Sequence, residues 1–145
     1  MSLNLVKLCV GVSAVEELQA FIDYRMDQRR KTGKECVSIH TTRMVPKRVD
    51  ELLNGGSLYW VIKGNVQVRQ HLVDIRTFND QEGIKRCDLV LEPRLILTQW
   101  QPRRAFQGWR YLKAEDAPAD LGSGASGINA LPPELRVELS NLGLL

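Results

Sequence analysis

The stretch SLYWVIKGNVQVRQHLVDI, residues 57–75, has the strongest strand character in the chain. Residues 58–62 are apolar and rich in aromatic and β-branched side chains, which fit a pleated, half-buried surface better than a helix. Glycines precede this run, and Gly64-Asn65 follows it. A glycine at the first central position supplies the positive φ that a tight turn requires, so the stretch predicts a long β-hairpin.

The second arm of this hairpin changes phase along its length. Val66 and Val68 alternate with polar residues, and the apolar pattern then resumes one step out of phase with Leu72, Val73 and Ile75. A shift of one residue moves side chains to the opposite face of a sheet. The slip therefore predicts a β-bulge within residues 69–71 that bends the strand.

Two strands and two helices are predicted before the hairpin. Residues 4–10 read as a buried strand, and Ser13 with Glu16 has the spacing of a capping box at the start of an amphipathic helix. Residues 36–40 predict a short strand. Pro46 then suits the first turn of a second helix, which ends at the glycines before the hairpin.

The segment after the hairpin predicts further strands. Residues 84–91 alternate in hydrophobicity, and residues 95–97 start another strand, after a proline, that runs through Trp100. Consecutive strands joined by short turns favour an antiparallel meander. We therefore expect an α+β fold, in which a curved, mostly antiparallel sheet closes toward a pseudo-barrel with two packed helices and a C-terminal helix.

Composition divides the chain into three parts. Residues 1–113 have the pattern of a single α+β core domain, whereas residues 114–130 are rich in Gly, Ala, Ser, Asp and Pro and predict a flexible linker. Residues 131–145 predict a final helix that docks on the core or on a second subunit.

Length and composition exclude several classes of protein. The 145 residues are 43% hydrophobic and 26% charged, as in ordinary globular proteins. No apolar run approaches the roughly 18 residues that span a bilayer, and residues 3–12 lack the features of a signal peptide. The three cysteines are far apart, which suits reduced, buried thiols, so we expect a cytoplasmic protein that binds no membrane.

Charge is distributed unevenly along the chain. Residues 40–113 contain 13 Lys or Arg against 7 Asp or Glu, whereas residues 114–145 contain 1 against 5. A basic middle suits an anionic ligand or a nucleic acid. The alternative is a solvated surface whose charges the acidic tail partly neutralises.

The sequence carries no recognisable metal or cofactor motif. His40 and His71 are the two histidines, and neither they nor the cysteines have the spacing of zinc ligands. No glycine-rich phosphate loop is present, and no nucleophile with its base can be singled out. We therefore expect neither a metal nor a cofactor, and whether the protein is an enzyme is left open.

Basic, aromatic and amide side chains supply what a nucleic acid or nucleotide uses: cations for phosphates, flat rings for stacking and amides for base edges. The alternative places the tryptophans in the core and pairs the arginines with carboxylates. The candidate binding residues are Arg43, Lys47, Arg48, Tyr59, Trp60, Lys63, Arg69, Gln70, Arg103, Arg104, Gln107, Trp109 and Arg110.

These residues also carry a resemblance. HTTRMVPKR (residues 40–48), ELLNGGSLYWVIKG (51–64), RQ (69–70) and PRRAFQGWRYL (102–112) resemble a family of uncharacterised alphaproteobacterial proteins, a domain of unknown function. The order of elements is also similar to PUA-like domains, including ASCH domains. That resemblance implies a small β-barrel that binds RNA or modified nucleobases, although Pro46-Lys47-Arg48 stands where ASCH domains have Gly-x-Lys.

Three functions remain open from the sequence. The leading hypothesis is a non-enzymatic module that binds RNA or a nucleotide-like anionic ligand. The first alternative is a hydrolase acting on a modified nucleoside-like substrate, with Lys47 and Glu51 as acid and base near Thr41 or Thr42. The second alternative is a protein-interaction module that forms a homo-oligomer through the C-terminal helix.

Overall fold

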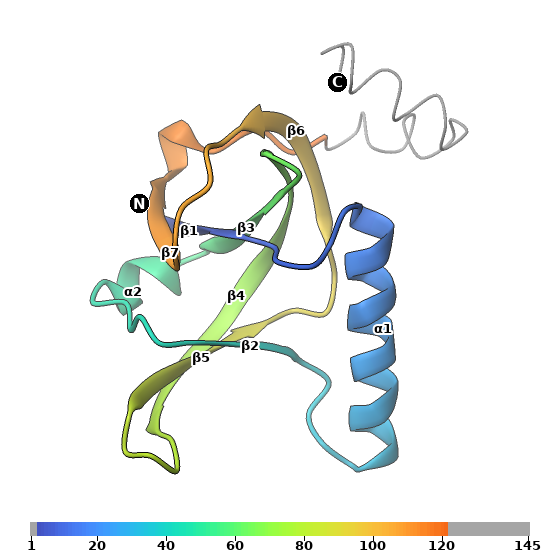
Figure 1. Ribbon diagram of the computed structural model, residues 1–145, viewed down its shortest axis with the longest axis vertical. Coiled ribbons are helices and arrows are strands. Elements are labelled where there is room, and N and C mark those ends of the chain that lie inside the picture. Colours follow the sequence, from blue (N-terminus) through green and yellow to red (C-terminus); the bar gives the residue numbers. More distant parts are fainter. Residues whose placement is uncertain (1–2, 122–145) are drawn as a thin grey trace.

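The computed structural model describes residues 3–121, in which a long helix packs against a curved, mixed β-sheet (Figure 1). Neither helix in this part of the chain is long and apolar enough to cross a membrane. The elements are β1 (Leu3–Leu8), α1 (Val15–Lys31), β2 (Ser38–Thr42), α2 (Val49–Leu52), β3 (Ser57–Ile62), β4 (Asn65–Asn79), β5 (Lys85–Leu91), β6 (Ile96–Pro102), β7 (Trp109–Lys113) and a 3-10 turn (Ala114–Asp116).

The predicted hairpin is formed by β3 and β4. Its turn lies one residue earlier than the sequence predicts, because Ile62 already pairs with Asn65. The two central residues, Lys63 and Gly64, have φ values of 49° and 80°. Positive φ at both positions is the type I′ geometry, whose twist matches that of the two strands.

Strand β4 connects the two halves of the sheet. Its first half lies between β3 and β6, and its second half pairs with β5. Its register shifts at Gln67 against β3 and at Val73 against β5. The predicted single bulge within residues 69–71 is therefore replaced by two irregularities on either side of it, and each bends the strand.

The sheet has the order β2-β5-β4-β3-β1-β7, with β6 beside β4. Five of its six strand pairings are antiparallel, which confirms the expected class. The sixth pairing is parallel, since β1 lies against β3 after a connection that includes α1, β2 and α2. The end strands β2 and β7 do not pair with each other in the described chain, so the sheet remains open rather than forming a closed barrel.

Apolar side chains cover both faces of the sheet. One cluster joins α1 to the sheet and includes Leu5, Ile22 and Leu89. A smaller cluster on β1, β3, β4 and β7 includes Val6 and Val61. All six residues of β3 are buried because this strand is covered on both faces, which explains the uninterrupted apolar run at residues 58–62.

Local details before the hairpin differ from the predictions. Helix α1 begins after Ala14, and the Ser13 hydroxyl donates to Glu17 (2.7 Å) rather than pairing with Glu16. Strand β2 begins at Ser38, two residues later than predicted, and this leaves Cys36 exposed rather than in the core. Helix α2 begins three residues after Pro46, which lies buried in the preceding loop.

The chain after β7 returns along β6. The backbone N–H of Gln99 donates to Ala119 (2.9 Å), and that of Leu121 donates to Leu97 (3.1 Å). These residues belong to the start of the segment predicted as a linker. The rest of that segment, and the predicted helix at residues 131–145, lie outside the described residues.

A substitution at Gly56 tests how closely the end of α2 approaches β1. A Cβ at this position would lie 2.1 Å from the backbone oxygen of Leu3 and 2.3 Å from that of Leu52. Because backbone must move to make room, we expect Gly56→Ala to lower the free energy of unfolding by about 3 kcal/mol or more. Urea unfolding followed by tryptophan fluorescence measures this loss.

Gly11→Ala is the matched control. Gly11 has φ +80° but open space around its Cβ position, so it should lose only about 1 to 2 kcal/mol. Equal losses in the two variants would contradict the close packing of α2 on β1.

Candidate functional site

Two aromatic side chains of β7 hold the loop that leads into α2. The Tyr111 hydroxyl accepts hydrogen bonds from the backbone N–H groups of Lys47 (2.9 Å) and Arg48 (3.3 Å). The Trp109 indole N–H donates to the carbonyl of Met44 (2.7 Å). The rings of Trp109 and Tyr111 meet edge to face, with centroids 4.9 Å apart. Side chains of β7 thus join the loop after β2, although β2 and β7 do not pair.

A hollow of about 430 Å³ lies beside this junction and is called the basic hollow below. It brings together three cations from separate parts of the chain, against one carboxylate. Arg48 precedes α2, Arg103 follows β6 and Lys113 ends β7. The lining residues are Leu3, Arg48, Gln101, Pro102, Arg103, Tyr111, Leu112, Lys113 and Asp116.

The hairpin turn and the 3-10 turn fix the walls of the basic hollow. The backbone N–H of Arg103 donates to the carbonyl of Gly64 (2.8 Å), so the β3–β4 turn anchors the end of β6. The Gln101 amide donates to the carbonyl of Asp116 (3.0 Å), which ties β6 to the turn after β7. The sequence features that form these turns therefore also position the cations.

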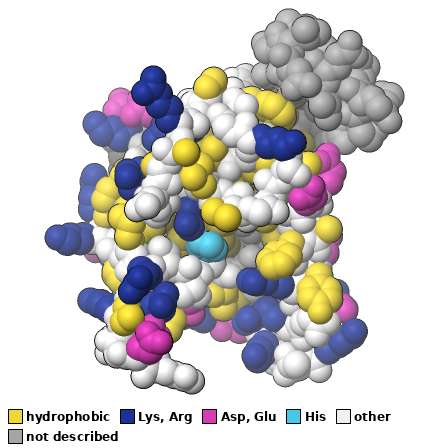
Figure 2. All heavy atoms as spheres, in the orientation of Figure 1, with side chains coloured by type: hydrophobic (Ala, Val, Ile, Leu, Met, Phe, Trp, Pro, Cys, Tyr) yellow, Lys and Arg dark blue, Asp and Glu magenta, His cyan; other side chains and the backbone are white. Residues whose placement is uncertain are grey.

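The cations of the basic hollow are only partly matched by carboxylates. Arg48 pairs with Glu51, which raises the pKa of the guanidinium and lowers that of the carboxyl group. Its guanidinium also lies over the Tyr111 ring, 5.6 Å from the centroid. Within the described chain, Arg103 and Lys113 have no carboxylate at ion-pair distance. Figure 2 shows Lys and Arg side chains gathered along the margin where Figure 1 places β7 and α2.

Several predicted binding residues line this hollow or have exposed side chains elsewhere. Arg48 and Arg103 line the hollow, and Lys47 precedes Arg48 in the loop that Tyr111 holds. Arg110 lies over the Phe106 ring (5.3 Å) and donates to the backbone. The other predicted residues with exposed side chains are Arg43, Lys63, Arg104 and Gln107.

The predicted stacking residues lie in the core. Tyr59, Trp60 and Trp109 are 7%, 5% and 5% exposed, which matches the alternative that the sequence left open for the tryptophans. The Trp60 indole donates to Gln70 (2.8 Å), and the Gln70 amide donates to the carbonyl of Glu92 (2.9 Å). Gln70 is therefore a buried bridge between β3 and the end of β5. Burial also raises the pKa of Tyr59.

Arg69 serves a structural contact. Its guanidinium donates to both carboxylate oxygens of Asp120 (2.8 and 2.6 Å) and to the Ser57 hydroxyl (2.7 Å). The hydrogen bonds to Asp120 raise the pKa of Arg69. A bidentate pair of this kind fixes orientation, so it fastens the chain after β7 to the sheet.

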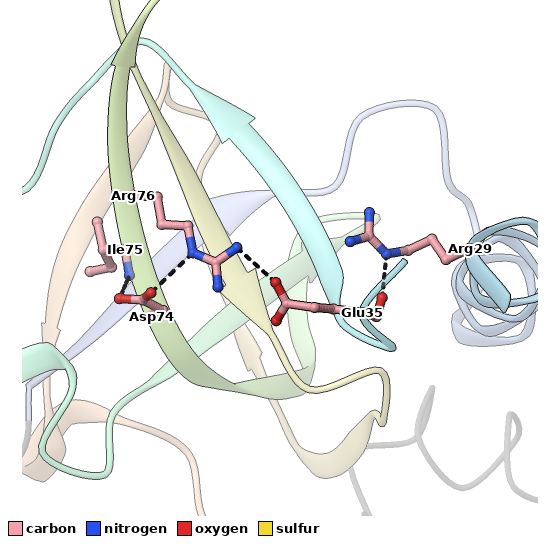
Figure 3. Close-up of polar contacts among 5 residues, drawn as sticks. All are labelled: Arg29, Glu35, Asp74, Ile75 and Arg76. Atoms are coloured by element: carbon pink, nitrogen blue, oxygen red, sulfur yellow. Dashed lines mark hydrogen bonds and ion pairs between the residues drawn. The ribbon is translucent and has the colours of Figure 1, made fainter. Parts of the chain in front are cut away.

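On the second half of β4, arginine side chains pair with carboxylates, in contrast to the basic hollow. Arg76 donates to Asp74 (3.1 Å) and to Glu35 (3.3 Å), and Arg29 donates to the backbone carbonyl of Glu35 (2.6 Å) (Figure 3). The bond from Arg76 is the main reason why the pKa of Asp74 is lowered. Arginine side chains in this cluster already have acceptors, so their charge is less available to a ligand.

The acid–base pair of the hydrolase alternative has other partners in the structure. Glu51 contacts Arg48 rather than Lys47, and the Thr41 hydroxyl donates to Asp88 (2.6 Å). Thr42 is buried. These groups therefore do not form one cluster.

Two of the three thiols do not offer a nucleophile, and the third, Cys36, is exposed. Burial raises the pKa of Cys9 and of Cys87 to about 11, so both are protonated at neutral pH. Among residues 3–121, no three His, Cys, Asp or Glu side chains come together as metal ligands.

Sequence reasoning missed Gln101, Tyr111 and Lys113 as lining residues. A signal for two of them was present, because Trp109, Tyr111 and Lys113 alternate along one strand and so share a face. Gln101 could not be found in this way, since its place depends on how β6 meets the turn after β7.

Comparison with known proteins identifies a family and no activity. Neither a curated protein nor a solved structure matches the chain, so the resemblance to PUA-like domains is not confirmed. A family model described as "Protein of unknown function (DUF1489)" matches residues 5–145. Because this match covers nearly the whole chain, the protein belongs to that family.

Proposed function

We propose that the basic hollow binds the phosphate groups of a short RNA segment or a nucleotide. The observation that carries this proposal is the convergence of Arg48, Arg103 and Lys113 on one hollow with a single lining carboxylate, Asp116. Arginine and lysine are the side chains that most often contact phosphate oxygens in nucleic-acid complexes.

The size and walls of the hollow support a small or single-stranded ligand. A volume of about 430 Å³ lies in the range of small-molecule sites. The three cations come from three segments that backbone and side-chain hydrogen bonds hold in place. Such preorganisation lowers the entropy cost of binding.

The burial of the aromatic rings limits how such a ligand is recognised. Tyr59, Trp60 and Trp109 are packed in the core, so recognition rests on phosphate contacts more than on base stacking. Phosphate contacts fix position without reading sequence. The proposed binding is therefore sensitive to salt and tolerant of sequence.

Neutralising the unmatched cations tests the proposal. We expect Arg103→Gln and Lys113→Gln each to weaken binding about tenfold, because each removes one cation that faces a phosphate group. For a single-stranded ligand, the slope of log affinity against log salt should also become shallower by about 0.7 in each variant. Fluorescence anisotropy with a labelled pool of short mixed-sequence RNA measures both quantities.

Arg76→Gln is the matched control, since it removes the same charge from a guanidinium that Asp74 and Glu35 already neutralise. It should leave the affinity almost unchanged. Equal weakening in Arg76→Gln and Arg103→Gln would mean that net charge, and not the basic hollow, drives association. Affinity that does not depend on salt would also contradict the proposal.

Tyr111→Phe tests whether β7 positions Arg48. The change removes only the hydroxyl that accepts from two backbone N–H groups, so we expect a stability loss of about 1 to 2 kcal/mol. RNA binding should weaken although no charge changes, because the loop that carries Arg48 loses its anchor. Urea unfolding and anisotropy measure the two effects.

Tyr24→Phe is the control for this hydroxyl. Tyr24 is 64% exposed on α1, and removing its hydroxyl should alter neither stability nor affinity. If Tyr111→Phe behaved like Tyr24→Phe in both measurements, the anchoring role of Tyr111 would be wrong.

A further inference from the structure

Lys7 is a cation on the core face of the sheet. Along β1, Leu3 and Leu5 are buried in the α1 cluster, and Lys7 is the next residue with the same orientation. Lys7 pairs in register with Trp60 on one side and with Trp109 on the other. Residues directly opposite each other share a face, so the half-buried Lys7 side chain leaves the sheet between two core tryptophans.

The charge of Lys7 has no counter-charge in the described part of the chain. None of the ion pairs among these residues includes Lys7, and no carboxylate accepts a hydrogen bond from it. Its positive charge opposes the effect of burial on the pKa of Cys9. A partly buried cation without a partner costs stability, so its presence at an inward position needs a reason.

His40 lies close to this cation, on the end strand β2. Its ring meets the Trp60 ring edge to face, with centroids 5.1 Å apart. Its Nε2 atom is covered by protein and has no hydrogen-bond partner among residues 3–121. Burial, and then the charges of Lys7 and Arg25, lower the pKa of His40 to about 4. An orphaned buried polar atom is rare in folded proteins and marks a place where a polar partner would be favourable.

Arg25 brings a second cation to the same place. It extends from α1, and its guanidinium donates to the carbonyl of Ile39 (3.4 Å), the residue before His40. The Phe21 ring supports the guanidinium at 4.5 Å. The nearest carboxylate on the neighbouring strand, Asp88, is opposite Thr41 in register and accepts from its hydroxyl, so it belongs to the other face of the sheet.

Lys7, Arg25 and His40 thus come from β1, α1 and β2. Lys7 and His40 both adjoin Trp60, and Arg25 reaches the backbone next to His40. We propose that Lys7, Arg25 and His40 form a binding site for a small oxyanion, a carboxylate or a phosphate group. This oxyanion site shares no residue with the basic hollow.

An oxyanion suits these three groups on chemical grounds. Ammonium and guanidinium groups donate strong, charge-assisted hydrogen bonds to carboxylate and phosphate oxygens. The anion would supply the counter-charge that Lys7 and Arg25 lack within the part of the chain that the structure describes. It would also favour the protonated form of His40, which the two cations now disfavour.

The presence of only two histidines makes the site directly observable. We would record ring resonances of the full chain by NMR, assign them with His71→Gln, and add inorganic phosphate or acetate at constant ionic strength. The His40 signals should shift saturably while those of His71 stay unchanged. At saturating anion the pKa of His40 should rise by about one unit. A response to acetate alone defines a carboxylate site, and a response to phosphate defines a phosphate site.

Two substitutions distinguish this site from the basic hollow. Lys7→Gln should weaken the anion response of His40 at least tenfold and leave RNA binding unchanged. Lys113→Gln should weaken RNA binding and leave the anion response of His40 unchanged. If Lys7→Gln did not fold, Arg25→Gln would serve instead, because Arg25 is exposed on α1.

Stability supplies an independent check. Lys7→Met keeps the length of the side chain and removes the unmatched charge, so its melting temperature should rise by roughly 2 to 5 °C. The oxyanion site would be overturned if no saturable shift of His40 were seen, if His40 and His71 shifted alike, or if Lys7→Gln and Lys113→Gln weakened the response equally.

Discussion

The hydrogen bonds from β7 to the loop after β2 are the contacts on which the basic hollow depends. Trp109 donates to Met44, and the Tyr111 hydroxyl accepts from the N–H groups that precede α2. These side chains link β7 to the loop that follows β2, and β2 and β7 are the end strands of the sheet. In a closed barrel, the end strands would instead be joined by backbone hydrogen bonds. A side-chain junction holds the ends together and still leaves the sheet open, so polar groups can occupy its margin.

The distribution of charge around this junction separates structural arginines from the candidate binding groups. Arg69 and Arg76 have carboxylate partners, and each fastens two parts of the fold. Arg103, Lys113 and Lys7 have none among residues 3–121, although two of them line a hollow and the third faces the core. Lys7 is partly buried, and a partly buried cation without a partner lowers stability, which is the usual cost of a binding site.

Sequence patterns predicted the parts of the fold that local chemistry decides. The glycines around residues 57–62 and the uninterrupted apolar run indicated the hairpin correctly, and the stripe on α1 indicated its buried face. The parallel pairing of β1 with β3 could not be predicted, because it depends on contacts between distant segments. The sequence indicated a register slip on β4. Its division between Gln67 and Val73 could not be predicted, because it also depends on the strands that pair with β4. At the hollow, Arg48 and Arg103 were among the predicted basic residues and Lys113 was not. The charges already neutralised by carboxylates could be recognised only from the three-dimensional structure.

Strand β7 holds the loop before α2 in place through Tyr111. Amide hydrogen exchange, measured by NMR on the full chain, is the direct test of this anchoring. The N–H groups of Lys47 and Arg48 lie outside the strands, yet they should exchange slowly because the Tyr111 hydroxyl accepts from both. Exchange of these two amides as fast as in an unprotected loop would contradict this anchoring, because the basic hollow would then lack a fixed wall.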